Sequence, residues 1–197
     1  MSQKEKNRPK NSAAKKIEIR LSGSGGQGLI LAGVILAEAA AIYEGKNAIQ
    51  TQSYGPEARG GASKSEVIIS DTEILYPKTS RLDYLLALNQ ESCDKYAHDL
   101  KEGGLLLVDS EAVEHVPPVK SVSLPFLKTA REEVGRLMTT NIVCLGALVG
   151  ISKVVSEQSL EKAVLSRVPK GTEQLNLTAL QKGFEMADRV AKQLSED

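Results

Sequence analysis

Histidine and cysteine are scarce in this sequence, which has two of each among 197 residues. His98 and His115 lie in polar contexts where neither can activate a serine or cysteine nucleophile, so a hydrolase triad has no support. Cys93 and Cys144 are far apart and fit no metal or redox spacing, and an iron–sulfur cluster ordinarily needs four thiolates. We therefore expect surface histidines, reduced thiols, a cytoplasmic protein and no metal held by this chain.

An excess of one charge and long apolar runs are missing as well. Lys and Arg number 25, as do Asp and Glu, a balance that indicates no nucleic-acid or membrane-surface role. The apolar runs are too short to cross a bilayer, and no signal peptide is recognisable. Residues 1–16 hold six Lys or Arg against one Glu, a local charge of +5. They are predicted to form a flexible, solvated tail rather than an anion-binding arm, with 17–197 as a single domain.

What is present is a glycine-rich turn between a strand-like and a helix-like segment. Gly23, Gly25 and Gly28 have the G-x-G-x-x-G spacing, after the apolar run 17–21 and before the apolar segment 29–43. Such a turn lets backbone amides approach a ligand, and the N-terminus of the following helix attracts an anion. The spacing alone is a weak signal, because the same glycines also serve close packing of strand against helix.

A carboxylate is absent where a dinucleotide site needs one. The predicted second strand, 47–52, lies where a site for NAD carries an Asp or Glu that binds the ribose hydroxyls. This chain offers only Gln50, Thr51, Gln52 and Ser53 there. A P-loop is excluded too, because no Gly-Lys-Ser/Thr follows the glycines. The turn therefore predicts an anionic ligand other than NAD.

The loop after this strand, 53–63, reads SYGPEARGGAS. Arg59 precedes Gly60 and Gly61, which places a guanidinium beside exposed backbone amides, and Arg binds carboxylates and phosphates bidentately. Loops at the carboxyl ends of adjacent parallel strands converge on one crevice, so we expect this loop beside the glycine turn. An ordinary hairpin with a surface arginine is the alternative.

The remaining pattern predicts an α/β fold: a Rossmann-like open, mostly parallel sheet with helices on both faces and a C-terminal helical segment. Further strands are expected at 64–70, 73–76 (as its antiparallel partner), 82–88, 105–108 and 119–124. Helices are expected at 90–101 after the N-cap Asn89, at 125–137, 141–151 and 156–168, and from a capping box at 178–181 onward.

Two of the expected helices, 29–43 and 141–151, have almost no polar face. A helix that is apolar all round is buried on more than one side. This pattern favours a subunit interface, and cover by the C-terminal helices of the same chain is the alternative. Asp109, at the end of its strand, is expected to cap the next turn rather than face a ligand.

At the two loops the sequence resembles the gamma subunit of 2-oxoacid:ferredoxin oxidoreductases. The resemblance spans residues 17–190 and rests on GSGGQG at 23–28, SYGPEARGGASKSEVIIS at 53–70 and Asn141, which opens NIVCLGALVG. The segment YGPEARGGASKSEV is most similar to the 2-oxoglutarate branch. The pyruvate, ketoisovalerate and indolepyruvate branches share the glycine turn and an Arg-Gly-Gly turn, and they stay open as alternatives.

The resemblance implies a thiamine-diphosphate-dependent enzyme that decarboxylates a 2-oxoacid oxidatively, joins the acyl group to coenzyme A and passes electrons to ferredoxin. It implies that partner alpha, beta and delta subunits hold most of the thiamine diphosphate, magnesium and iron–sulfur clusters, and that this chain is inactive alone. A free-standing regulatory module that binds a nucleotide or coenzyme A is the second hypothesis.

The site candidates follow from these two loops, and none is expected to be catalytic. Gln27 is the one whose side chain is expected to reach a ligand. The candidates for cofactor binding are Gly23, Gly25, Gly26, Gln27 and Gly28, and those for binding substrate or coenzyme A are Tyr54, Gly55, Arg59, Gly60, Gly61 and Ser63.

Overall fold

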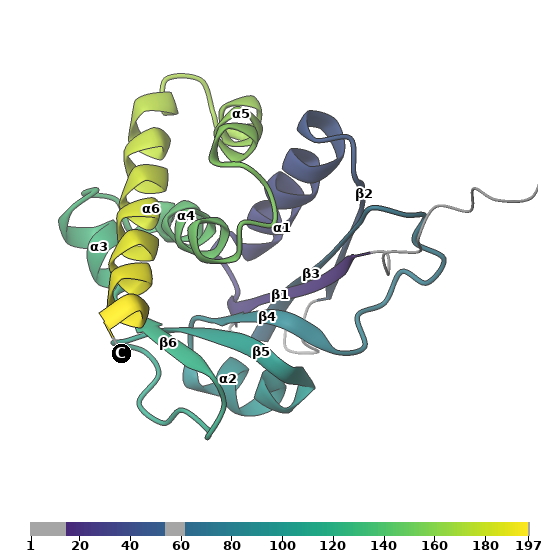
Figure 1. Cartoon of the computed structure of the whole chain (residues 1–197). Helices are drawn as coiled ribbons and strands as arrows, with labels where there is room; N and C mark the ends of the chain where they lie inside the picture. The colour runs from purple at the N-terminus through teal and green to yellow at the C-terminus, as the bar shows by residue number, and fades with distance from the viewer. Residues whose placement is uncertain (1–14, 54–61, 197) are drawn as a thin grey trace, which may run out of the picture.

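The computed structural model describes residues 15–53 and 62–196 (Figure 1), and within them six strands form one sheet in the order β2-β3-β1-β4-β5-β6. The strands are β1 Lys16–Ser24, β2 Asn47–Ser53, β3 Ala62–Ser70, β4 Leu82–Ala87, β5 Leu100–Asp109 and β6 Ser121–Leu124. Strands β1, β4, β5 and β6 are parallel, whereas β3 runs antiparallel to both of its neighbours. The predicted open, mostly parallel sheet is confirmed.

Helices lie on both faces of this sheet, as predicted. One face carries most of them, and α2 with a short 3₁₀ turn covers the other (Figure 1). The helices are α1 Leu29–Glu38 with a π-helical turn Ala39–Tyr43, α2 Gln90–Tyr96 with a 3₁₀ turn Ala97–Asp99, α3 Phe126–Glu132, a 3₁₀ turn Leu137–Thr139 leading into α4 Thr140–Ser152, α5 Glu157–Arg167 and α6 Glu173–Glu196. No helix in the described ranges combines the length and apolarity that a membrane span requires.

Strand β1 shows how the alternating sequence builds two different faces. Its apolar residues point into the large core under α1 and α4, and its polar residues point toward α2. Arg20 on that second face is only 6% exposed. Its Nη2 lies 2.6 Å from Glu66 Oε1, its Nη1 contacts Asp99, and its guanidinium lies 4.7 Å from the ring centroid of Tyr96. The buried cation is therefore compensated by two carboxylates and an aromatic face.

Helix α4 is buried along almost its whole length, and α6 of the same chain supplies much of the cover. The two helices touch through glycines: a Cβ at Gly146 would lie 2.3 Å from the carbonyl oxygen of Leu180, and one at Gly183 would lie 2.2 Å from that of Val143. The alternative that the C-terminal helices cover α4 is thus the correct one. Helix α1 is also packed on the sheet, but Leu31 on it is 39% exposed.

Several predicted elements are wrong in detail. The return strand 73–76 does not form, because β3 pairs with β1 on one side and β2 on the other and has no free edge. The helix predicted over 90–101 ends at Tyr96, since β5 already begins at Leu100. The capping box at 178–181 is not a helix start, because Thr178 lies inside α6 and its hydroxyl donates to the carbonyl of Gln174.

The predicted helix 125–137 is shorter, since α3 ends at Glu132 before a turn at Gly135, where φ is +82°. The N-caps were predicted well. Asn89 accepts a hydrogen bond from the amide of Ser92, and Ser156 accepts one from that of Ser159. Residues 1–14 of the predicted tail lie outside the described residues, and Lys16 belongs to β1.

Candidate functional site

The candidate site lies where the parallel strands β1, β4 and β5 end at one edge of the sheet. The strand ends that flank the second loop lie at the same edge, because Ser53 at the end of β2 pairs with Lys64, and Ala62 at the start of β3 pairs with Ser24 of the glycine turn. The two loops therefore start together as predicted, but for a different reason: β2 and β3 form an antiparallel hairpin beside β1. Five candidates lie outside the described residues: Tyr54, Gly55, Arg59, Gly60 and Gly61.

The glycines of the turn differ in their backbone angles and in the space around them. Gly26 and Gly28 adopt left-handed backbone angles, with φ of +91° and +73°. Gly23 is enclosed, because a Cβ there would lie 2.3 Å from Gln27 Oε1. Gly25 is exposed, its φ is not positive, and a Cβ there would meet no atom of the described residues within 4 Å. The described part of the fold therefore tolerates a side chain at Gly25, and its role toward a ligand stays a prediction.

Two candidate side chains form hydrogen bonds to the backbone of the turn. Gln27 Oε1 accepts a hydrogen bond of 2.7 Å from the amide of Ser24, which closes the turn. Ser63 is buried, and its hydroxyl donates to the carbonyl of Gly23 over 3.4 Å. Ser63 thus ties β3 to β1. The role of Gln27 toward a ligand stays a prediction, and its Nε2 is the atom through which it would act.

The N-terminus of α1 lacks a side-chain cap. The N-cap residue is Gly28, no side chain among the described residues caps this end, and the first turn contains no acidic residue. Helices α2 and α5 each have a capping side chain and a glutamate in the first turn, whereas the N-cap residues of α3 and α4, like that of α1, make no such bond. The first amides of an α-helix have no partner within the helix and carry a partial positive charge. Anion binding at this end of α1 is consistent with these properties and stays a prediction.

Two asparagines hold the turn from the side. Asn141, at the start of α4, donates from Nδ2 to the carbonyl of Gly28 over 3.1 Å. Asn89, which caps α2, donates from its own Nδ2 to Ser24 Oγ over 2.9 Å. Asn89 had been predicted only as a cap, and no local pattern reveals its second bond. Asn141 was singled out by the family resemblance alone.

Asp109 also lies at this edge, at the end of β5, and is fully buried. Its Oδ1 accepts hydrogen bonds of 3.0 Å from the amides of Glu111 and Ala112, and its Oδ2 accepts one of 2.8 Å from the amide of Leu127. Asp109 therefore caps the following turn and α3, as predicted. With its oxygens engaged by backbone amides, it is not placed to act as a base.

Thiol and imidazole groups lie away from this edge or are buried. Burial raises the pKa of both the Cys93 and the Cys144 thiol, so neither is poised as a thiolate. His98 is exposed, with 74% of its side chain accessible. Across the ranges that the structure describes, no three His, Cys, Asp or Glu side chains are arranged to hold a metal ion.

The model of the pyruvate ferredoxin/flavodoxin oxidoreductase family matches residues 18–186. This chain belongs to that family. Within it, the chain is 56% identical over 174 residues to the 2-oxoglutarate synthase subunit KorC of Methanocaldococcus jannaschii, which covers 86% of this chain and 93% of the relative.

Solved structures of the pyruvate ferredoxin/flavodoxin oxidoreductase type show the same fold. The gamma subunit of the keto/oxoacid ferredoxin oxidoreductase of Geobacter sulfurreducens is 58% identical, with a TM-score of 0.82 over 88% of this chain and 97% of that one. The 2-oxoglutarate:ferredoxin oxidoreductase of Magnetococcus marinus, solved with 2-oxoglutarate, coenzyme A and succinyl-CoA bound, is 25% identical with a TM-score of 0.79, over 89% of this chain and 31% of that one. The resemblance to gamma subunits is confirmed.

Proposed function

We propose that this chain is the gamma subunit of a thiamine-diphosphate-dependent 2-oxoglutarate:ferredoxin oxidoreductase, and that it helps to complete the site where coenzyme A receives the acyl group. Family membership supports an oxidoreductase subunit. The names of the archaeal relative and of the Magnetococcus structure, which both carry 2-oxoglutarate, favour this oxoacid. The alpha, beta and delta subunits of the same enzyme are the proposed partners, with ferredoxin as the electron acceptor.

The observation that carries this role is the uncapped N-terminus of α1 behind the exposed Gly25. The phosphate groups of coenzyme A are anions that accept hydrogen bonds, and such groups bind at the N-termini of helices after glycine turns. No carboxylate in the first turn repels them. Asn141 fixes the turn through the Gly28 carbonyl, so the amides are oriented before the ligand arrives.

The other cofactors are assigned to the partners. The two thiols of this chain are buried and unpaired with one another, and the described residues contain no grouping of ligands for a metal or a cluster. Thiamine diphosphate supplies the chemistry of decarboxylation when it is bound. We infer that this chain contributes binding and orientation of coenzyme A, that it is inactive alone, and that it works in the cytoplasm, where free thiols persist.

The test replaces Gly25 by alanine in the assembled enzyme and follows reduction of ferredoxin at varied coenzyme A. The added methyl group lies where the ligand must approach, so the Michaelis constant for coenzyme A should rise roughly tenfold, as for the loss of one hydrogen bond to a charged group. The free energy of unfolding should stay the same or increase by up to about 1 kcal/mol, because the site can accept a Cβ. The two measurements therefore distinguish an effect on coenzyme A binding from an effect on folding.

A matched control is Gly171→Ala, which lies in the turn before α6 with φ of +86° and open space around it. This variant should lose stability through backbone strain and keep the Michaelis constant for coenzyme A. An unchanged Michaelis constant for coenzyme A in Gly25→Ala would show that the glycine turn does not bind coenzyme A. Full turnover by an enzyme assembled without this chain would overturn the proposal as a whole.

The substrate branch is tested by comparing four oxoacids in the same assay: 2-oxoglutarate, pyruvate, 3-methyl-2-oxobutanoate and indolepyruvate. The highest kcat/KM is expected for 2-oxoglutarate. A preference for another of the four would move the enzyme to that branch. A stable monomer that binds coenzyme A but shows no partner in native mass spectrometry would favour the regulatory module instead.

A further inference from the structure

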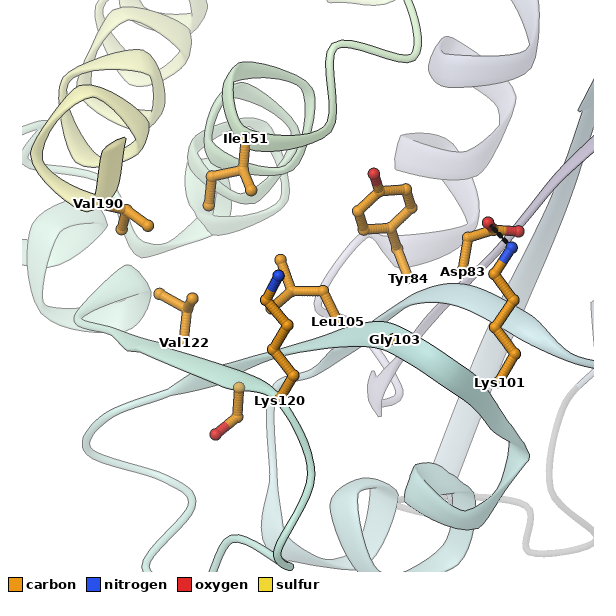
Figure 2. A pocket seen from close by; sticks show the side chains of 10 residues that line it. Asp83, Tyr84, Lys101, Gly103, Leu105, Lys120, Val122, Ile151 and Val190 are labelled. Carbon is orange, nitrogen blue, oxygen red and sulfur yellow. Dashed lines mark hydrogen bonds and ion pairs between the residues drawn. The ribbon is translucent and has the colours of Figure 1, made fainter. Parts of the chain in front are cut away.

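A hollow lies at the amino ends of β4, β5 and β6, whereas the glycine turn follows the carboxyl end of β1. Figure 2 shows the residues that line this hollow. It is a cavity of about 320 Å³. Its sheet side is formed by Tyr84, Leu105 and Val122, and Ile151 of α4 and Val190 of α6 close it from the helix side. Most of the surface that a ligand would meet is therefore apolar.

An irregularity in β5 forms one side of this cavity. Leu82 of β4 pairs with Leu100, and Tyr84 pairs with Leu105, so a single β4 residue faces the stretch 101–104. Gly103 takes a left-handed φ of +76° within this bulge, and a Cβ at Gly104 would lie 2.8 Å from the carbonyl of Leu82. Bulges re-aim side chains and occur frequently beside binding sites. Lys101 and Gly103 of this bulge line the cavity.

Two lysines line the cavity, and one of them has no ion-pair partner among the described side chains. Lys101 forms an ion pair with Asp83, whose other oxygen accepts a hydrogen bond of 2.9 Å from the amide of Glu18. Lys120, just before β6, is exposed, and among the side chains that the structure describes no carboxylate lies within ion-pair distance of its ammonium. Figure 2 shows Lys120 rising beside Leu105 toward the helix layer. A negative charge entering the cavity would therefore meet an uncompensated ammonium group.

A hydroxyl group supplements this cation. Tyr84 is half-buried, and Figure 2 shows its hydroxyl directed toward the same helix layer as the Lys120 ammonium. Burial and the neighbouring Asp83 carboxylate raise the pKa of Tyr84, so the hydroxyl keeps its proton and remains a donor. One cation and one donor above apolar walls match a ligand with a single acceptor group and an apolar body.

We propose that this cavity binds a small organic monocarboxylate, with the carboxylate on Lys120 and the aliphatic part against Leu105, Val122 and Ile151. A dicarboxylate fits less well, because Lys101 is already neutralised by Asp83 and a second anionic group would face Asp83 or the apolar wall. The volume is at the lower end of the range for small-molecule sites. This site is separate from the glycine turn and does not depend on the function proposed for it.

The experiment titrates the full-length chain with hexanoate and follows backbone amides by NMR. Saturable shifts are expected at Tyr84, Leu105 and Val122. The neutral probe 1-hexanol, of the same carbon number, should bind about tenfold more weakly, the value for a hydrogen bond to a charged group. Lys120→Met should lower the affinity for hexanoate to that of hexanol, and Val122→Phe, which fills the cavity, should abolish the binding of both.

The matched control is Lys128→Met, on the exposed side of α3, which changes the net charge equally. This variant should bind hexanoate like the unmodified chain. If Lys120→Met and Lys128→Met lose the same affinity for hexanoate, the attraction comes from net charge and not from a site at Lys120. Equal affinity for hexanoate and hexanol would contradict recognition of the carboxylate. The absence of saturable shifts at the cavity would overturn the site, and tighter binding of 2-oxoglutarate than of hexanoate would overturn the preference for one carboxylate.

Discussion

Replacing Gly28 by alanine is the sharpest test of how the glycine turn is held. Gly28 has φ +73° and ψ +17°, the left-handed region. An L-residue there costs roughly 1–2 kcal/mol. The new Cβ would lie 2.7 Å from Asn141 Nδ2 and 3.1 Å from its Cγ. The asparagine must then move and give up its hydrogen bond to the Gly28 carbonyl, which is worth about 1 kcal/mol. The free energy of unfolding should fall by about 2–3 kcal/mol in total.

Urea denaturation followed by circular dichroism measures this loss. Gly45→Ala isolates the backbone part, because φ at Gly45 is +66° and its Cβ would meet nothing within 4 Å. That variant should lose only roughly 1–2 kcal/mol. In a chain that already carries Asn141→Ala, Gly28→Ala should cost no more than Gly45→Ala does, a coupling of about 1 kcal/mol. Equal losses for the two glycine variants in the unmodified chain would refute the restraint by Asn141.

Two further predictions concern stability. Burial alone would raise the pKa of Glu66, but hydrogen bonds from Thr79 and Arg20 hold it below its ordinary 4.5. A depressed pKa adds stability that is present above about pH 4.5 and is lost as the pH falls through the folded value. Glu66→Gln should therefore flatten the loss of unfolding free energy between about pH 5 and 3 in urea titrations, and an unchanged acid slope would contradict this. Ser152 Oγ is buried without a partner among the described residues. Ser152→Ala should raise the unfolding free energy by about 1 kcal/mol in thermal melts, whereas Ser166→Ala, which removes a hydroxyl bonded to Glu38, should not.

Features that depend on a few neighbouring residues could be predicted from the sequence. Asn89 and Ser156 were recognisable as caps because a cap bonds to an amide three residues away. The alternation in β1 and the glycine spacing before α1 are local in the same sense. The glycine turn was therefore located correctly, and the end of the second loop was placed beside it.

Features that depend on distant segments could not be predicted in this way. The bond between Asn141 and Gly28 joins residues 113 positions apart. The strand β3 was recognised, but its pairing on both sides was not, because pairing is decided by the whole sheet. The start of α6 was misplaced because Thr178 fits a capping pattern, whereas the helix begins at Glu173 and the Thr178 hydroxyl donates to the carbonyl of Gln174. The apolar faces of α1 and α4 showed that cover was needed but not which segment supplied it.

The packing of α6 on α4 also sets an order of events during synthesis. Helix α4 is translated before α6, and until Gly183 and its neighbours are available its apolar surface has no cover from that side. A nascent chain at this stage exposes surface that promotes aggregation. We therefore expect chaperones to hold the emerging chain longest over residues 140–152, and ribosomes that stall before α6 to yield insoluble product.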